Sequence, residues 1–365
     1  MNIGNAVCRL ESAQINLNSS FIYILSGVAN NLSRVLLAIF SLLLLMLSGA
    51  LLAQDTVTNT LHSGSDDSLP GSVDVEFVRV TDGIYVRYGR HEPISADSVA
   101  AIANHGFIVG DAAVAIVDPG GSEDMSIRVL AAVSRITALP VTHVIVTHVH
   151  PDHSLGLAAY SEEKFEQKPV IVGHKTLAGA LRHNLEFFKQ QNFVTDAVVE
   201  KISGLIDEET FQSVEHELTL DLGNREIVIS SFENAHSGSD ISVFDKTTKA
   251  LWAGDLLFVD RLPTIDGSVL GWLAALERLS GFDIDTVIPG HGRSGDYRTL
   301  VQPQLDYFNL LVKNTREAIA QGVSLSEYIA RGGDFSKPVL RGNWELVDHQ
   351  HAVNLSRAYS ELEWE

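Results

Sequence analysis

The chain has 365 residues, and 45% of them are hydrophobic, which is enough for a sizeable globular core. Its 26 Lys and Arg residues against 46 Asp and Glu residues give a formal net charge of −20 at pH 7, so the surface repels nucleic acid and we exclude a nucleic-acid-binding function. The single cysteine, Cys8, lies in the N-terminal segment, so a metal site in the rest of the chain must be built from His and carboxylate side chains.

Residues 1–53 have the pattern of an export signal or a membrane anchor. Val35–Ala53 is an almost uninterrupted apolar stretch that follows Arg34, and small residues such as Ser48 and Ala50 offer a cleavage region. An uncleaved anchor is the alternative, because 19 residues, 35 through 53, can just span a bilayer. We expect a cleaved signal, a periplasmic or otherwise exported protein, and only transient membrane contact through this segment.

A polar linker over residues 54–74, rich in Ser, Gly, Thr and Asp, is expected to lead into a folded domain over residues 75–365. The domain begins with four short segments in which apolar side chains alternate around turn residues. These segments predict two hairpins, 76–80 with 84–88 and 102–109 with 112–117. Apolar residues at helical spacing from Met125 to Ile136, Ile127 among them, predict a helix that leads to a buried strand at Val144.

The second half of the domain alternates helices and strands again. Residues 176–214 are predicted to be a helical insertion, which is either extra cover for the core or a lid over a site. A long amphipathic helix from Asp296 opens a C-terminal helical extension over about residues 296–365. Strands are expected at 218–220, 227–229, 241–244, 250–253 and 286–288. This order predicts an α/β (α+β) protein with two sheets packed face to face and helices outside.

The stretch His148-Val149-His150-Pro151-Asp152-His153 carries four potential metal ligands, directly after the apolar run 144–146. Three imidazoles and a carboxylate this close together would leave polar atoms unsatisfied in an ordinary core. A divalent cation removes that problem, because neutral imidazole nitrogen and ionised carboxylate are both good ligands. A polar loop that is merely rich in histidine is the alternative, but ligand-type spacing at a strand end favours a metal site.

Three further candidate ligands stand at the ends of predicted strands: His236, Asp255 and His291. Loops in such places can hold ligands in fixed geometry, and flanking glycines let the backbone approach closely. Each residue alone would be an ordinary polar side chain. Together with the six-residue motif they give seven ligands, which is enough for two metals that share one bridging carboxylate.

These residues resemble the metallo-β-lactamase-fold hydrolase superfamily with its His-x-His-x-Asp-His signature. The resemblance covers about residues 75–295 and implies a four-layer αββα sandwich with the site at one edge of the paired sheets. It also implies two Zn²⁺ per chain. The ligands carried over by motif are His148, His150 and His236 for the first metal, Asp152, His153 and His291 for the second, and Asp255 as the bridge.

Within the superfamily, a complete His/Asp set without cysteine is more similar to glyoxalase II-type thioesterases than to the true β-lactamases. Three stretches, residues 83–89, 91–95 and 357–365, most resemble exported quinoprotein relay system zinc metallohydrolases. That resemblance implies a small-molecule substrate and an exported quinoprotein partner, and it leaves the natural substrate open.

The ligand set suits hydrolysis by a metal-bridging hydroxide that attacks the carbonyl carbon of a thioester, lactone, lactam or related bond. We expect Asp152 to act catalytically, because it would bind a metal, orient the hydroxide and accept its proton. Asp118, Thr147, Ser237 and Asp240 are expected to hydrogen-bond the ligands, with turn-building as the alternative role.

Two other readings remain open from the sequence. Relatives with much the same ligands bind iron and oxidise sulfur compounds, so iron or a mixed-metal centre is one alternative. A non-catalytic accessory protein for an exported quinoprotein, with a structural metal site, is the other.

Overall fold

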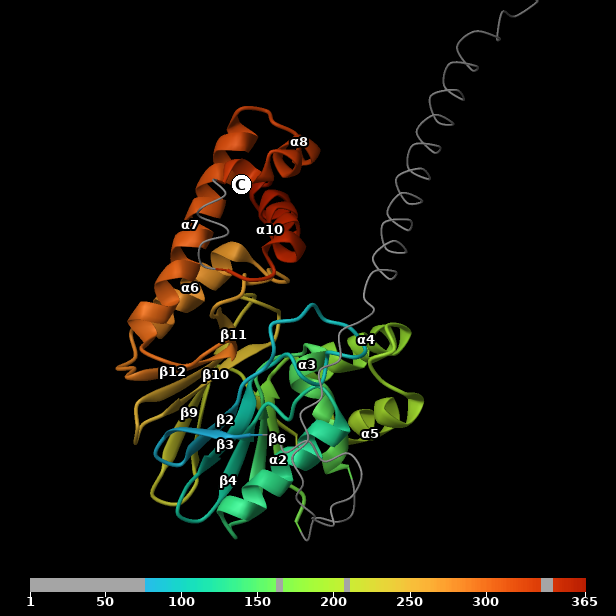
Figure 1. Cartoon of the computed structure of the whole chain (residues 1–365), viewed down its shortest axis with the longest axis vertical. Coiled ribbons are helices and arrows are strands. Elements are labelled where there is room, and N and C mark those ends of the chain that lie inside the picture. The colour runs from blue at the N-terminus through green and yellow to red at the C-terminus, as the bar shows by residue number, and fades with distance from the viewer. Residues whose placement is uncertain (1–75, 162–166, 207–210, 336–343) are drawn as a thin grey trace, which may run out of the picture. The chain divides into compact units, whose positions relative to one another are not determined.

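Two β-sheets form the centre of the part of the chain that the computed structural model describes, residues 76–161, 167–206, 211–335 and 344–365 (Figure 1). The described residues fall within one unit, Val73–Glu365. The predicted signal or anchor (1–53) and the linker (54–74) lie outside the described residues. Within the described ranges, none of the helices is long and apolar enough to cross a membrane.

The first sheet has seven strands that lie side by side in chain order. The pairs from β1 to β4 are antiparallel, and the pairs from β4 to β7 are parallel. Both predicted hairpins are present within the antiparallel part. The strands are β1 Val78–Thr81, β2 Ile84–Arg87, β3 His105–Val109, β4 Val114–Val117, β5 Val141–Val146, β6 Val170–His174 and β7 Phe211–Val214.

The second sheet has five strands in the order β12-β11-β10-β9-β8. Its β11 and β12 pair parallel, and the other pairs are antiparallel. The strands are β8 Glu217–Asp221, β9 Glu226–Phe232, β10 Asp240–Asp245, β11 Ala250–Phe258 and β12 Thr286–His291. The expected strands of the second half are therefore all present.

Helices cover the outer face of each sheet (Figure 1). Against the first sheet lie α2 Glu123–Ile136, η1 Leu155–Tyr160, α4 Leu177–Gln190 and α5 Asp196–Ile206. Against the second lie α6 Val269–Leu279, α7 Tyr297–Ala320, α8 Leu325–Ala330 and α10 Val347–Leu362. The short helices α3 Pro151–Ser154 and η2 Gly332–Asp334 complete the described elements. The predicted αββα sandwich is confirmed.

Buried apolar side chains join the two sheets into one core. Ile108 and Ile145 of the first sheet lie in the same cluster as Ile229, Trp252 and Ile288 of the second, and all five are at most 1% exposed. At about 25 cal/mol per Å² of apolar surface removed from water, this interface is a large stabilising contribution. The strand ends that carry the candidate ligands are therefore fixed relative to one another.

A buried ion pair adds directional contacts between the sheets. The Arg225 guanidinium donates to both carboxylate oxygens of Asp245 on β10 (3.1 and 2.8 Å). It also donates to the carbonyls of Asp82 (2.7 Å), in the turn between β1 and β2, and of Val109 (2.9 Å) at the end of β3. The carboxylate and the carbonyls together satisfy the buried charge, as a desolvated guanidinium requires.

The segment predicted to be a helical insertion over residues 176–214 is only partly helical. It contains α4 and α5, but it ends in strand β7, which pairs parallel with β6 and extends the first sheet. Leu181 and Leu185 of α4 are buried in the cluster beneath that sheet. The two helices therefore act as core cover and not as a lid.

Two local predictions were shifted by tertiary contacts. Strand β3 begins at His105 and not at residue 102, because Asn104 bonds the end of β12: its amide donates to the carbonyl of Gly290 (2.7 Å), and its side chain donates to the carbonyls of Pro289 and Gly292 (2.8 and 2.7 Å). Helix α2 forms as predicted, but Ile127 is 43% exposed, because the buried face is the one that carries Val129 and Val133.

Candidate metal centre

The fold brings all seven candidate ligands to one edge of the paired sheets. His148 and His150 follow β5, and Asp152 and His153 lie in the short helix α3 that begins directly after them. The other three come from the second sheet: His236 from the loop after β9, Asp255 from β11 and His291 from the end of β12. Asp255 thus lies inside a strand, whereas the sequence predicted it just beyond one.

The seven side chains form two adjoining clusters. His148, His150, His236 and Asp255 make up the first cluster, and Asp152, His153 and His291 make up the second; within each cluster the ligand atoms lie within 4.8 Å of one another. All are buried except His150, whose side chain is 25% exposed. The site therefore opens towards solvent on the His150 side.

Asp255 stands between the two clusters. Its Oδ2 lies 3.3 Å from His236 Nε2 and 3.6 Å from His148 Nε2 in the first cluster. The same atom lies 3.4 Å from His291 Nε2 in the second cluster, and Oδ1 lies 3.1 Å from His153 Nε2. A carboxylate that reaches both clusters with its two oxygens has the position of a bridging ligand.

Two glycines allow Asp255 to reach this position. Gly254 adopts a φ of +54°, and the pairing of β11 with β12 changes register around it. A Cβ atom on Gly290 of β12 would lie 1.9 Å from Asp255 Oδ1. Glycine is the residue that tolerates both the left-handed backbone and so close an approach.

Protein acceptors fix the proton of the second-cluster imidazoles on the nitrogen that points away from the centre. His153 Nδ1 donates to Asp118 Oδ2, and His291 Nδ1 donates to the carbonyl of Ile102, both at 2.8 Å. The Nε2 lone pair of each ring is therefore left facing inward. Outer partners of this kind fix the tautomer and the ring orientation of metal-bound histidines.

The first cluster follows the same rule. His236 Nδ1 donates to the carbonyl of Thr264 (2.9 Å), and His148 Nδ1 lies 3.0 Å from Thr147 Oγ1. His150 is reversed, because its Nε2 faces Asp266 Oδ2 (3.2 Å) and its Nδ1 points inward. One lone pair from each of the five imidazoles thus converges on the centre.

The imidazole nitrogens and carboxylate oxygens that face the centre cannot all hydrogen-bond one another, but they can bind a pair of cations. His150 Nδ1 lies 3.0 Å from His148 Nε2 and 2.9 Å from His236 Nε2, so lone pairs face lone pairs. His153 Nε2 and Asp255 Oδ1 are both buried without a hydrogen-bond partner among the described residues. Buried nitrogen and oxygen lone pairs in this arrangement are the donor set that zinc and related divalent ions bind.

Negative charge concentrates around His153. Burial lowers the pKa of this imidazole, but the carboxylates of Asp255, Asp152 and Asp118 outweigh burial and raise its pKa well above the usual value. Three carboxylates around one buried ring leave an excess of negative charge when the ring is neutral. A divalent cation would compensate that excess.

Asp118 and Thr147 lie against the ligands, as predicted. The Asp118 carboxylate is fully buried and accepts from the Thr147 amide (2.7 Å), the Thr147 hydroxyl (2.8 Å) and His153. The Thr147 hydroxyl donates to Asp118 and is therefore available to accept from His148 Nδ1. One carboxylate thus orients one ligand of each cluster.

Ser237 and Asp240 have the alternative, turn-building role. The amide and hydroxyl of Ser237 both donate to Asp240 (2.7 Å each), which closes the turn after His236. Burial raises the pKa of Asp240 to about 7, although the hydrogen bonds from Ser237 oppose that rise. These residues shape the loop that carries His236.

Two residues at the site were missed by the sequence reasoning. Asp266 bonds His150, and its Oδ1 accepts from Arg357 of helix α10 (2.9 Å). Arg261 is buried with Nη1 3.1 Å from His291 Nδ1, and its Nε has no partner among the described residues. Neither residue belongs to a recognisable motif, because its contact depends on tertiary packing alone.

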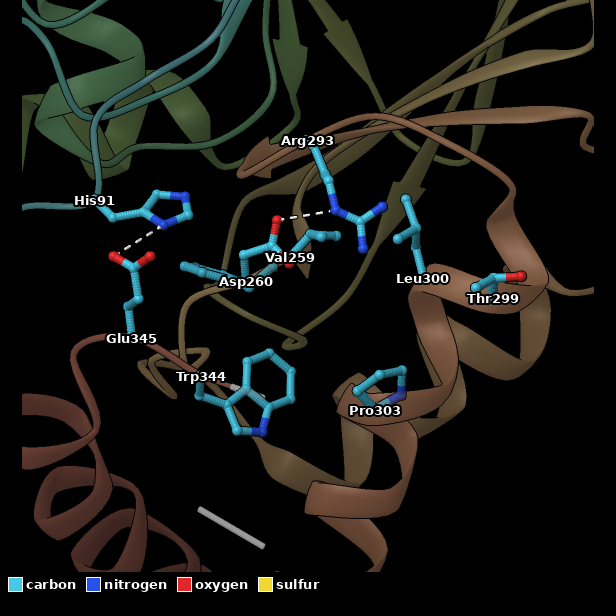
Figure 2. A pocket seen from close by; sticks show the side chains of 10 residues that line it. His91, Val259, Asp260, Arg293, Thr299, Leu300, Pro303, Trp344 and Glu345 are labelled. Atoms are coloured by element: carbon cyan, nitrogen blue, oxygen red, sulfur yellow. Dashed lines mark ion pairs between the residues drawn. The ribbon is translucent and has the colours of Figure 1, made fainter. Parts of the chain in front are cut away.

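A cavity of about 640 Å³ adjoins the site through Phe258. The Phe258 ring lines this cavity and stacks on His291, with centroids 5.0 Å apart. Figure 2 shows two ion pairs among its lining residues, His91 with Glu345 (3.3 Å) and Asp260 with Arg293 (3.1 Å).

The pH dependence of the metal-stripped protein is expected to reflect His236. Burial lowers the pKa of its imidazole from 6.5 to about 3, so the unfolded chain takes up the proton first as the pH falls. The stability that this group contributes is present above about pH 6.5 and is lost as the pH falls towards about 3. Urea unfolding at pH 7.5 and pH 5 should show a smaller stability loss in His236→Gln than in the wild type. An equal loss in both proteins would contradict this assignment.

Comparison with known proteins places these residues within a described family. A model of the metallo-beta-lactamase superfamily matches residues 100–291, which include all seven candidate ligands. The linear primary-alkylsulfatase of Pseudomonas sp. (strain ATCC 19151) is 42% identical over 64 residues. That match spans 17% of this chain and 12% of the alkylsulfatase.

Similarity to a solved alkyl sulfatase structure agrees with this fold. A double mutant of the sec-alkyl sulfatase PisA1 superimposes with a TM-score of 0.59 at 16% identity, covering 80% of this chain and 51% of that one. A metallo-beta-lactamase from Pontibacter korlensis gives a TM-score of 0.48 at 16% identity, covering 64% of this chain and 98% of that one.

Proposed function

Because this chain belongs to the metallo-beta-lactamase superfamily, we propose that it is a metal-dependent hydrolase whose two ligand clusters hold a pair of divalent cations. One observation carries the proposal: five imidazoles and two carboxylates form two adjoining clusters, and Asp255 reaches both of them. A dinuclear centre of this kind supplies the activation of water and the polarisation of substrate oxygen that hydrolysis needs.

The chain's own residues have distinct roles in this proposal. Asp152 Oδ2 lies 3.4 Å from His291 Nε2 and 3.7 Å from His153 Nε2, where it can bind metal, orient the attacking water and accept its proton. Asp118 keeps His153 in the tautomer that presents Nε2. The opening beside His150 is the side from which a small-molecule substrate can approach.

The leading substrate class is a carbonyl compound such as a thioester, lactone or lactam, because the complete His/Asp ligand set without cysteine is similar to that of glyoxalase II-type thioesterases. Alkyl sulfate esters are a second candidate. The observation that favours them is the 64-residue match at 42% identity to an alkylsulfatase.

Metal analysis followed by a substrate panel tests the proposal. The purified full chain is expected to contain about two metal equivalents and to hydrolyse at least one member of a panel of thioesters, lactones, β-lactams and alkyl sulfates. A coloured iron protein that consumes oxygen with a thiol or persulfide would instead identify a sulfur oxidase. Bound metal without turnover across the whole panel would favour the non-catalytic accessory role.

Zinc as the native metal, export and a quinoprotein partner are proposed from sequence features alone. The apolar stretch at 35–53 supports export, and the stretches at 83–89, 91–95 and 357–365 support the quinoprotein relay subfamily. Fractionation of the producing cell tests the location, because the mature chain should be found in the periplasmic fraction.

A further inference from the structure

Residues 263–268, which we call the strap, contact two candidate ligands of the first cluster. The carbonyl of Thr264 accepts from His236 Nδ1 (2.9 Å), and Asp266 Oδ2 accepts from His150 Nε2 (3.2 Å). The backbone is tied to the same loop, because the Asp266 amide donates to the carbonyl of His236 (3.2 Å). A displacement of the strap would therefore turn both imidazoles.

Helix α10 holds the strap through polar side chains. Asn354 is fully buried, accepts from the amide of Ile265 (2.9 Å) and donates to the carbonyl of Pro263 (2.7 Å). Three residues further on, Arg357 Nη2 donates to Asp266 Oδ1 (2.9 Å). The Arg357 guanidinium thus holds in place the Asp266 carboxylate that orients His150.

A third contact lies where the strap meets helix α6. Glu361 accepts from the amide of Val269 (2.8 Å) and from the hydroxyl of Ser268. Asn354, Arg357 and Glu361 are spaced by three and then four residues, which places them on one face of the helix. Side chains on one face of α10 therefore hydrogen-bond the strap along its whole length.

An adjacent face of α10 is anchored in the core. Leu355, Ala358 and Leu362 are at most 3% exposed and belong to the cluster beneath the second sheet. Asn354 Nδ2 also donates to the hydroxyl of Tyr307 on α7 (3.0 Å). The helix is thus a fixed support against which the strap is held. Figure 1 shows α10 beside α7 and α6, at the end of the chain.

We propose that α10 is a positioning element of the first metal subsite, acting through the strap on His236 and His150. This inference rests on the proposed dinuclear centre. It goes beyond the family match, because α10 lies outside the matched residues 100–291.

The contacts predict an effect confined to one subsite. The strap reaches His236 and His150 of the first cluster, whereas His153 and His291 of the second are oriented by Asp118 and by the carbonyl of Ile102. Loss of an outer partner typically lowers metal affinity by about 10- to 100-fold. Loss of a contact that holds the strap should therefore lower the metal affinity of the first subsite and leave that of the second unchanged.

The test is a titration of the metal-free full chain with Co²⁺, followed by its visible spectrum and by calorimetry. Arg357→Ala is expected to weaken one of the two binding steps roughly tenfold, the lower end for an outer partner, and to leave the other unchanged. The spectrum of the weakened step should also change, because the Asp266 carboxylate that orients the His150 ring loses its Arg357 partner. Arg357→Lys, which keeps a donor, should restore part of the affinity.

Arg316→Ala is the matched control. Arg316 is 50% exposed, close to the 52% of Arg357, and it pairs with a carboxylate of the same C-terminal region, Glu365 (2.8 Å). This control should bind Co²⁺ as the wild type does.

Three results would overturn the inference. Two unchanged binding steps in Arg357→Ala, when the wild type binds two ions, would refute it and leave the proposed function intact. Equal weakening of both steps with a lowered melting temperature would show a merely structural helix. A wild type that binds no Co²⁺ at all would overturn the inference and the proposed function together.

Discussion

Asparagine in place of Asp255 is expected to remove about one metal equivalent and to lower hydrolytic turnover about 1,000-fold. The loss of one cation removes several kcal/mol of transition-state stabilisation, and each 1.36 kcal/mol is a tenfold change in rate. The substitution keeps the shape of the side chain and removes its charge. In its place, an amide N–H group would face the inward lone pairs of imidazoles that now lie 3.1 to 3.6 Å from the carboxylate.

Metal content by elemental analysis, measured together with turnover, checks this prediction. Asp260→Asn is a suitable control, because Asp260 follows the same strand but pairs with Arg293 (3.1 Å) and is 42% exposed. The control should retain both metals and normal turnover. An Asp255→Asn protein with two metals and full activity would refute the bridging assignment.

The second large effect is expected from Asp118→Asn. The buried carboxylate accepts three hydrogen bonds, two of them at Oδ2 from the Thr147 hydroxyl and His153 Nδ1. An amide with its nitrogen at that position would place an N–H donor opposite two other donors, so those hydrogen bonds could not form. Each buried group left unpaired costs about 1–3 kcal/mol of unfolding free energy. Loss of the His153 partner should also weaken metal binding about 10- to 100-fold.

The backbone does not complicate this experiment. Asp118 adopts a φ of +55°, and asparagine tolerates the left-handed region as aspartate does. Thermal unfolding and metal titration of the variant should both shift, whereas Asp111→Asn in the exposed β3–β4 turn should change neither. Wild-type metal affinity in Asp118→Asn would mean that His153 needs no outer partner.

Four of the seven ligands could be predicted from the sequence because their spacing is local. His148, His150, Asp152 and His153 fall within six residues after an apolar strand, so the chain itself brings them together. Turn residues and period-two alternation predicted the hairpins for the same reason. The two-sheet architecture followed from the order of such elements.

Predictions failed where neighbours distant in sequence decide the outcome. β7 joined the first sheet although its segment is mostly helical, because the edge of β6 offers backbone partners. Ile127 remained exposed, because helical spacing specifies a period and not which side of the helix meets the sheet. Asp255 lies within β11, because pairing with β12 extends the strand beyond its apolar run.

The sequence by itself predicted the fold class and the seven residues of the candidate metal centre. Only the tertiary structure decided which imidazole nitrogen faces inward in His150, His153, His236 and His291, because the hydrogen-bond partner of the other nitrogen lies far along the chain. Asp266 lies 116 residues from His150, and the carbonyl of Ile102 lies 189 residues from His291. The hydrogen bonds between α10 and the strap likewise join residues that are distant in the sequence. Such contacts leave no local pattern, since they arise when packed sheets and helices bring separate segments together.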